Sequence, residues 1–319
     1  MNEWIDTYRG INNSFKKKLV FRFGVEAGFF SEYNNLIISI LYCLKHSIKF
    51  ELYSRHANFA KSDGWNDFFV PFVAVNNQDI NRYFNLRYGV ERVELEYPLQ
   101  SIIKPRYVGI AYKALYGITY LTQDLWSRQR DPSLASEHFT ISALGINQAT
   151  LVEAARPFIN AFWRYNNNAA KIISSIIDTV PLPASYVSIH IRAGDKSSET
   201  KTYDYSQYMV LAQQFSLNKK AFILTDDYTV VEFLRSDYSD WEFYTLCDPS
   251  ERGYHQDDFN KLDKEVKYRH NLRLFAELDI ASAAARFIGT YSSNVGMYMG
   301  MRIGPERCSC VDFDNWVMW

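Results

Sequence analysis

The sequence predicts an α/β protein made of two Rossmann-like domains that face a cleft. Three observations predict this fold: a β-α-β pattern over residues 17–53, a sharp break at PLPAS (Pro181–Ser185), and alternating strand and helix patterns over residues 186–293. Alternation of this kind implies a mostly parallel sheet with helices on both of its faces. We therefore expect an N-terminal domain over residues 1–180 and a C-terminal domain over residues 181–319.

The composition narrows the class of protein. With 319 residues, of which 47% are hydrophobic, the chain can bury a sizeable core. The net charge of −1 argues against nonspecific nucleic-acid binding, which needs a basic face. The N-terminus MNEWIDTYRG lacks an apolar h-region, and no run of about 18 apolar residues follows. These features predict a soluble, cytoplasmic chain without an integral membrane segment.

Aromatic residues are abundant, at 16% of the chain with 23 Tyr and 22 Phe. Because tyrosine joins a large apolar ring to a polar tip, the excess is compatible with stacking on sugars or nucleobases. It fits a tyrosine-rich lineage equally well.

The N-terminal β-α-β unit carries a loop with two glycines. We expect a strand over Lys18–Gly24, a helix that begins near Ser31, and a second strand over Ile48–Ser54. The loop that contains Gly24 and Gly28 lies between a strand and a helix N-terminus, where an anion is readily received. Its spacing is not GxGxxG, so it does not predict a dinucleotide site.

The middle of the chain is the least regular part. Residues 60–150 show many aromatics and scattered turns, and we expect them to shape an acceptor side. Ala149–Val180 has helical periodicity, with an interruption predicted at Pro157.

The C-terminal half alternates regularly between short apolar runs and amphipathic segments. The expected strands are Tyr186–Ile191, Lys220–Asp227, Trp241–Leu246 and Arg286–Ser293, and the expected helices are Tyr205–Leu217, Tyr228–Tyr238 and His270–Ala285.

Polar residues follow three of these strands at the point where each strand ends. The loops are HIRAGDKSSE from His190, TDD from Thr225, and GTYSSN from Gly289. Ligands of open parallel sheets bind at the carboxyl ends of the strands. Arg192 can grip phosphate bidentately, Gly194 lets backbone approach a ligand closely, and hydroxyls with free amides at a helix start suit phosphate oxygens. An anion site at this edge competes with the simpler interpretation of solvated turns and helix caps.

A metal site is not predicted. Asp226 and Asp227 are adjacent, whereas a DxD-type motif has a spacer, and adjacent acids are commonly a helix cap and its neighbour. Among the cysteines, Cys308 and Cys310 have only Ser309 between them, a poor zinc spacing without a second pair. A reducing compartment is the simpler account.

The three loops resemble the three motifs of GDP-fucose fucosyltransferases. The likeness rests on HIRAGDK, AFILTDD and ELDIASAAARFIGTYSSNVG, with support from FRFGVEAGFFSEYNNLIISILYCLKHSIKFEL and DGWNDFFVP. It is greatest to the α-1,6-fucosyltransferases, which comprise the core N-glycan and rhizobial chitin-oligosaccharide enzymes. The resemblance implies a GT-B fold, a metal-independent inverting reaction without a cofactor, and a donor site for GDP-fucose in the C-terminal domain.

The resemblance also implies roles for single residues. Arg192 matches the arginine that holds the donor pyrophosphate, and Lys196 with Glu199 matches a pair that assists acceptor deprotonation. The remaining donor-binding positions are His190, Gly194, Asp195, Tyr208, Asp226, Asp227, Ser292 and Ser293. The acid that recognises the base stays open, because matching LDI selects Asp279 and counting back from the serines selects Glu277.

Two departures from the family pattern are visible. Ala193 stands where the family has a second arginine, which would weaken the grip on the donor or alter its selectivity. The membrane anchor, coiled stem and SH3-like domain of the animal enzymes have no counterpart, which suggests a minimal bacterial or viral version with a different acceptor.

The sequence thus favours transfer of fucose to a hydroxyl of a glycan. Arg192, Lys196 and the amides of GTYSS would stabilise the leaving diphosphate, and Glu199 would take the acceptor proton. The alternatives are another nucleotide-sugar donor, such as GDP-rhamnose or a UDP-sugar, a noncatalytic glycan- or nucleotide-binding protein, and a metal-dependent transferase.

Overall fold

A computed structural model of the chain describes residues 2–25, 27–86, 105–194 and 203–318. The chain divides into two compact units, Met1–Arg164 and Tyr165–Trp319. The division falls before the predicted boundary at residues 180 and 181, because the helix that precedes PLPAS packs within the second unit. Its Asn168 Nδ2 donates a hydrogen bond to the Tyr268 hydroxyl (3.1 Å).

The first unit contains a three-stranded parallel sheet with the order β2-β1-β3. Its helices and strands are α1 Asn2–Ser14, β1 Lys17–Arg22, α2 Phe29–Lys45, β2 Ile48–Tyr53, α3 Asn81–Phe84, α4 Pro105–Leu115, β3 Tyr120–Leu121, α5 Thr122–Gln129, β4 His138–Ile141, β5 Ile146–Thr150 and α6 Leu151–Phe162. The predicted β-α-β unit is confirmed as β1-α2-β2, and β4 and β5 form a separate antiparallel pair.

Pro157 does not interrupt α6, contrary to the prediction. The residue removes one backbone donor from the helix, but Ala154 and Ala155 before the expected break and Phe158 and Ile159 after it are fully buried. Burial of this apolar face holds the helix together through the proline. The chain breaks instead after Phe162, before α7 begins at Asn167.

The aromatic residues of the first unit form its core. Trp65 stacks on Phe69 with ring centroids 4.5 Å apart, and Phe69 contacts Trp163 at 5.0 Å. Phe29 and Phe59 join the same cluster at 5.1 Å from each other. All but Trp163 are at most 5% exposed. The DGWNDFFVP segment therefore serves packing, and this part of the aromatic excess is explained by the core.

Gly24 is required by the packing of this unit. Its φ of +79° lies in the left-handed region, and a Cβ there would lie 2.5 Å from both Ala57 and Phe59. Its amide nitrogen donates to Oε2 of the buried Glu32 (3.3 Å). Gly28 is the N-cap of α2, which begins two residues before the predicted start at Ser31.

The second unit contains a five-stranded parallel sheet with the order β10-β9-β6-β7-β8. Its elements are α7 Asn167–Ile177, β6 Val187–Ile191, α8 Tyr205–Phe215, β7 Lys220–Thr225, α9 Tyr228–Asp237, β8 Glu242–Thr245, α10 Gln256–Lys261, α11 Lys264–Ala283, β9 Arg286–Gly289, α12 Asn294–Ile303 and β10 Cys308–Cys310. Each predicted strand and helix of this half is present, with shorter strands, and β10 was not predicted.

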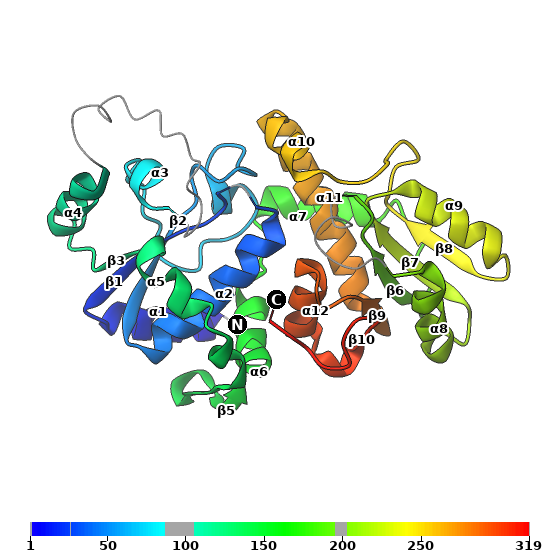
Figure 1. Cartoon of the computed structure of the whole chain (residues 1–319), viewed down its shortest axis with the longest axis horizontal. Coiled ribbons are helices and arrows are strands. Elements are labelled where there is room, and N and C mark those ends of the chain that lie inside the picture. The colour runs from blue at the N-terminus through cyan, green and yellow to red at the C-terminus, as the bar shows by residue number, and fades with distance from the viewer. Residues whose placement is uncertain (1, 26, 87–104, 195–202, 319) are drawn as a thin grey trace. The chain divides into compact units, whose positions relative to one another are not determined.

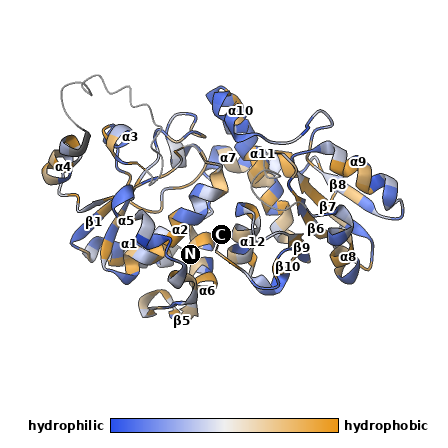
Figure 2. Cartoon of the chain, in the orientation of Figure 1, coloured by the Kyte–Doolittle hydropathy of each residue, from blue (hydrophilic) through white to orange (hydrophobic). Residues whose placement is uncertain are grey.

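Helices cover both faces of this sheet, as the alternation predicted. Figure 1 shows β6 and β7 between α11 on one side and α8 and α9 on the other. The central strands are strongly hydrophobic and α10 is hydrophilic (Figure 2). Val187, Ile189 and Ile223 are completely buried in the core that α8 and α9 form with the sheet.

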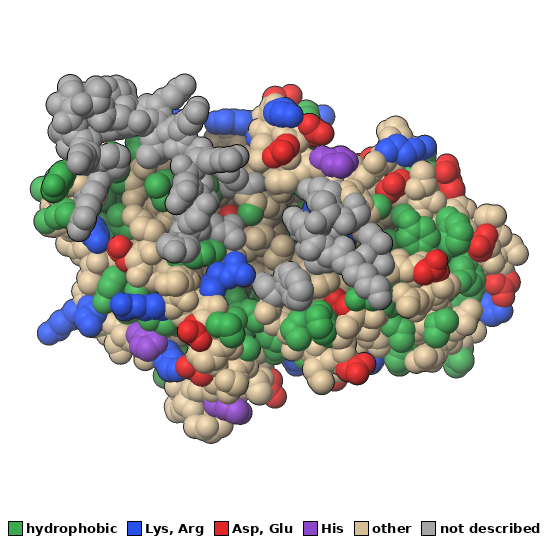
Figure 3. Space-filling model, viewed as in Figure 1, with side chains coloured by type: hydrophobic (Ala, Val, Ile, Leu, Met, Phe, Trp, Pro, Cys, Tyr) green, Lys and Arg blue, Asp and Glu red, His purple; other side chains and the backbone are tan. Residues whose placement is uncertain are grey.

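Charges of both signs are distributed over the described surface. In the view of Figure 3, blue and red side chains are interspersed among tan and green atoms, in keeping with the net charge of −1. Within the described ranges, we find no helix that has both the length and the hydropathy needed to span a membrane.

Candidate functional site

The candidate site lies at the carboxyl edge of the five-stranded sheet, where the loops after β6, β7, β8 and β9 begin. All strands of this sheet run parallel, so their carboxyl ends fall on one edge. Three of the four loops were predicted to meet there. The fourth, which joins β8 to α10, was not recognised as part of the site, although the same rule places the end of β8 at this edge.

Asp226 joins the loops after β6 and β8. Its carboxylate accepts hydrogen bonds from the backbone N–H of Ala193 (2.8 Å) and of Tyr254 (2.9 Å). Its own carbonyl accepts from the Gly253 amide (2.8 Å). A carboxylate that receives two amide hydrogen bonds is a strong positioning group, because these bonds are charge-assisted. Asp226 therefore holds the loops after β6 and β8 together at the carboxyl edge of the sheet.

Gly194 is needed because the loop after β8 runs directly against it. A Cβ at Gly194 would lie 2.1 Å from the carbonyl oxygen and 2.6 Å from the nitrogen of Tyr254. The predicted close approach of backbone is thus present, but the neighbour is the chain's own backbone. Gly253 supports the approach with a φ of +97°, which side-chain-bearing residues rarely adopt.

Arg192 follows β6 and is half-buried. Its guanidinium lies over the ring of Tyr254, 5.5 Å from the ring centroid. The other charged members of this loop, Asp195, Lys196 and Glu199, lie outside the described residues.

His190 is a buried, neutral side chain at the end of β6. It is 4% exposed, and its Nδ1 has no hydrogen-bond partner among the described residues. Burial, and then the neighbouring Arg192 charge, lowers the pKa of His190 to about 3. An imidazole with this pKa can accept or donate one hydrogen bond without carrying a charge.

Asp227 caps a helix, as the simpler interpretation predicted. Its carboxylate accepts from the amide (2.9 Å) and the hydroxyl (2.8 Å) of Thr229 at the start of α9. The carboxylates of both adjacent acids, Asp226 and Asp227, therefore accept hydrogen bonds from backbone amides. The described ranges contain no group of three or more histidine, cysteine or acidic side chains that could hold a metal ion.

The turn after β9 is held by an acid that the sequence did not point to. Asp312 accepts hydrogen bonds from the amides of Tyr291 (2.9 Å) and Ser292 (2.8 Å). The Ser293 hydroxyl caps α12 by accepting from Gly296 N (2.9 Å), and it donates to Thr290 O (2.8 Å). The expectation that the amides of GTYSS are open to a phosphate is therefore wrong for Tyr291 and Ser292.

Tyr208 lies on α8, near this turn. It is 4% exposed, and burial, together with the Asp312 carboxylate, raises the pKa of its hydroxyl. Tyr208 is neutral at physiological pH and remains a hydrogen-bond donor. The link to Asp312 could not be seen in the sequence, because residues 311–319 follow the last predicted element.

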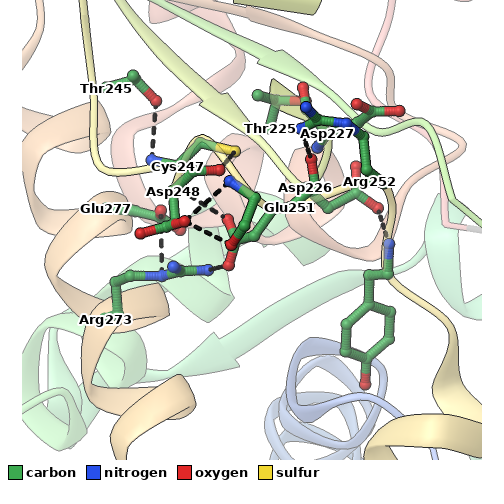
Figure 4. A network of polar contacts seen from close by, with 12 residues as sticks. Thr225, Asp226, Asp227, Thr245, Cys247, Asp248, Glu251, Arg252, Arg273 and Glu277 are labelled. Atoms are coloured by element: carbon green, nitrogen blue, oxygen red, sulfur yellow. Dashed lines mark hydrogen bonds and ion pairs between the residues drawn. The ribbon is translucent and has the colours of Figure 1, made fainter. Parts of the chain in front are cut away.

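The structure separates the two candidate acids of α11. Glu277 is 5% exposed and lies 3.8 Å from Nε of Arg273, which also pairs with Glu251 of the loop after β8. Figure 4 shows Glu277 and Arg273 turned toward Glu251 and Cys247, with Asp226 close by. Glu277 therefore belongs to the carboxyl edge of the sheet.

Asp279 points to a different place. Its carboxylate pairs with Arg302 (2.6 Å) and accepts from the Tyr165 hydroxyl (2.9 Å). Arg302 lies in the last turn of α12, nine positions after Ser293, a rise of about 13 Å along a helix. Asp279 is thus next to the far end of the helix whose first turn was predicted to meet phosphate. This geometry favours Glu277 as the acid of the site.

Burial makes Glu277 sensitive to pH. Desolvation, opposed by Arg273 and reinforced by Glu251 and Asp226, raises the pKa of Glu277 from 4.5 to about 7. Because the folded state binds this proton more tightly than the unfolded state, the stabilisation is complete below pH 4.5 and is lost as pH rises through 7.

We therefore expect Glu277→Gln to remove part of the pH dependence of stability. Thermal melts at pH 5 and pH 8 should show a smaller loss for the variant than for the wild type, since glutamine stays neutral at both. Arg273 keeps its pairing with Glu251 in the variant. Melting temperatures that fell in parallel for both proteins would contradict the role of Glu277.

Comparisons with known proteins support the fold at low sequence identity. No protein-family model matches the chain, and a search of curated proteins finds no match. Among solved structures, NodZ α-1,6-fucosyltransferase soaked with GDP-fucose matches with a TM-score of 0.52 at 15% identity, covering 90% of this chain and 93% of that one. The chain has a GT-B fold.

Two further structures agree. Fucosyltransferase NodZ from Bradyrhizobium matches with a TM-score of 0.52 at 15% identity, and the match covers 94% of this chain and 96% of the NodZ chain. NodZ co-crystallised with GDP has a TM-score of 0.50 at 16% identity, with the same coverage. The GT-B expectation is confirmed over nearly the whole chain, and the resemblance to fucosyltransferases is supported at the level of the fold.

Proposed function

We propose that the chain is a glycosyltransferase that transfers fucose from GDP-fucose to a hydroxyl of a glycan or glycoconjugate. The observation that carries the proposal is the meeting of Arg192, His190 and Glu277 at the carboxyl edge of one parallel sheet. The solved structures that share the GT-B fold include a fucosyltransferase soaked with GDP-fucose and one co-crystallised with GDP.

Each part of the donor has a suitable partner in the proposal. Loss of GDP from the sugar builds negative charge on the diphosphate, which Arg192 stabilises together with Lys196. The hydroxyls of Ser292 and Tyr208 supply the neutral donors. Since the Tyr291 and Ser292 amides are bound by Asp312, they take no part in this step.

Glu277 supports guanine as the base. The Watson–Crick edge of guanine presents the N1–H and N2–H₂ donors side by side, and the ionised form of Glu277, which is populated at and above its pKa of about 7, accepts two such bonds at once. Uracil and thymine present only one N–H donor there. Asp279 is not assigned this role, because Arg302 and Tyr165 bind both of its oxygens.

The reaction in this proposal is a metal-independent inverting displacement. The acceptor oxygen attacks C1 of fucose, the C1–O bond to the β-phosphate breaks, and the acceptor proton passes to Glu199. In this proposal the positive charge of Lys196, three positions earlier in the chain, keeps Glu199 ionised. Undiminished transfer in EDTA would support the absence of a metal, and loss of transfer in EDTA would refute it.

Donor identity is tested by thermal-shift measurements with GDP, UDP and dTDP. A ligand at about 100 times its dissociation constant should raise the free energy of unfolding by about 2.7 kcal/mol. Of the three nucleotides, we expect only GDP to produce this shift. A shift with UDP or dTDP only would overturn the choice of donor, and release of GDP from GDP-fucose would exclude a noncatalytic protein, the alternative that Ala193 raises.

Glu199→Gln should lose turnover while still binding GDP. A general base contributes about 10²- to 10⁴-fold in rate, and glutamine cannot take a proton. Transfer should be followed with GDP-fucose and an acceptor, and GDP affinity by calorimetry on the same preparation. Full turnover with unchanged GDP affinity would show that another group takes the proton.

A further inference from the structure

Tyr254 is one of the residues of the candidate site that the sequence did not indicate. It follows β8 in the loop that runs against Gly194, and its ring lies under the Arg192 guanidinium at 5.5 Å. A guanidinium over an aromatic face is attracted by the ring quadrupole, and the attraction strengthens when water is excluded.

The orientation of the Tyr254 ring is fixed from several directions. Its backbone N–H donates to Asp226 (2.9 Å), and its hydroxyl donates to Oε1 of Gln256 (3.0 Å). The ring also contacts Phe259 and His270, each with centroids 5.7 Å apart. A side chain held by backbone, hydroxyl and ring contacts loses little further entropy when it supports a neighbour.

Arg192 and Tyr254 are also tied together through the backbone. Asp226 accepts from the amide of Ala193, the residue after Arg192, and from the amide of Tyr254 itself. One carboxylate therefore sets the spacing of the two loops, and the ring contact sets the direction of the guanidinium between them.

We infer that Tyr254 is a positioning residue that holds Arg192 in the orientation needed to bind the diphosphate of the donor. The inference rests on the proposed function and deepens it. The residue after Arg192 is alanine, so no second arginine adjoins it, and the bidentate contact depends on the orientation of the Arg192 guanidinium. Tyr254 acts through Arg192 and needs no contact with the ligand.

The test measures the affinity of three variants for GDP and for guanosine by calorimetry. Tyr254→Leu removes the ring, and we expect it to weaken GDP binding about 3- to 30-fold while leaving guanosine binding unchanged. Tyr254→Phe keeps the ring, and should bind GDP within about twofold of the wild type. A general structural defect would weaken GDP and guanosine alike and would not be rescued by phenylalanine.

A double-mutant cycle separates positioning from other effects. In an Arg192→Ala background, Tyr254→Leu should cause no further loss of GDP affinity, because the group that it positions is gone. Equal losses in both backgrounds, or unchanged GDP binding by Tyr254→Leu, would overturn the inference.

The failure of the proposed function gives a different result. If the wild type bound UDP in place of GDP, the donor assignment would fall, and the same series with UDP and uridine would decide the role of Tyr254. If the wild type bound no nucleoside diphosphate and no inorganic pyrophosphate, both the proposed function and this inference would be refuted.

Discussion

Arg192→Ala should lower the rate of transfer by at least about 10²- to 10³-fold. Removal of one preorganised donor to a developing negative charge typically costs this much. The effect should reach the upper part of the range here, since Ala193 leaves no second arginine beside it. The melting temperature should change little, because Arg192 is only half-buried and stacks on a ring that stays in place.

Arg192→Lys is the matched control for this result. Lysine keeps the positive charge but loses the planar fork and the stacking geometry, so we expect it to recover only part of the activity. Turnover with GDP-fucose, together with GDP affinity, should be measured for all three proteins. Turnover of Arg192→Ala within threefold of the wild type would exclude the arginine from the reaction.

Asp279→Asn should reduce stability strongly and leave GDP binding intact. The carboxylate pairs with Arg302, which is mostly buried, and also accepts from Tyr165. Removal of one partner of a buried ion pair leaves an uncompensated charge and costs about 3 kcal/mol. For a unit of this size, the loss corresponds to a fall in melting temperature of about 6–12 °C.

Two further variants define the meaning of this result. Asp258→Asn removes an exposed pair with Lys261, both side chains being 75% exposed, and should change stability by less than about 1 kcal/mol. Glu277→Gln should have the opposite profile to Asp279→Asn, with GDP affinity reduced and stability retained. GDP affinity that fell with Asp279→Asn and not with Glu277→Gln would exchange the roles of the two acids.

For the second unit, the sequence alone determined the order of the strands from β6 to β9 and the edge at which the site lies. Apolar runs such as VSIHI and AFILT, each followed by polar residues, identify strands and their carboxyl ends from local pattern only. Parallel pairing then brings His190, Arg192 and Asp226 to one edge. The same reasoning predicted helix caps in the loops before α9 and α12, because capping acts between residues two or three positions apart, and the structure assigns them to Asp227 and Ser293.

Local pattern failed where long-range packing decides. Pro157 stays within α6 because of the core that α6 contacts, and the first unit ends at Arg164 because α7 packs on α11. Neither effect can be predicted from a window of a few residues, because helix propensity contributes less to the stability of a helix than the burial of its apolar face does.

Only the tertiary structure decided which partners the site residues have. Asp226 meets the amide of Tyr254, 28 positions away, and Asp312 meets the turn after β9, 20 positions before it. The sequence does not distinguish Glu277 from Asp279. Because they are two positions apart on a helix, their side chains point in different directions and contact different neighbours. The sequence therefore identified the residue types and the edge of the sheet, whereas the fold chose Glu277, Asp312 and Tyr254, because contacts across a sheet edge depend on distances in space that sequence spacing does not carry.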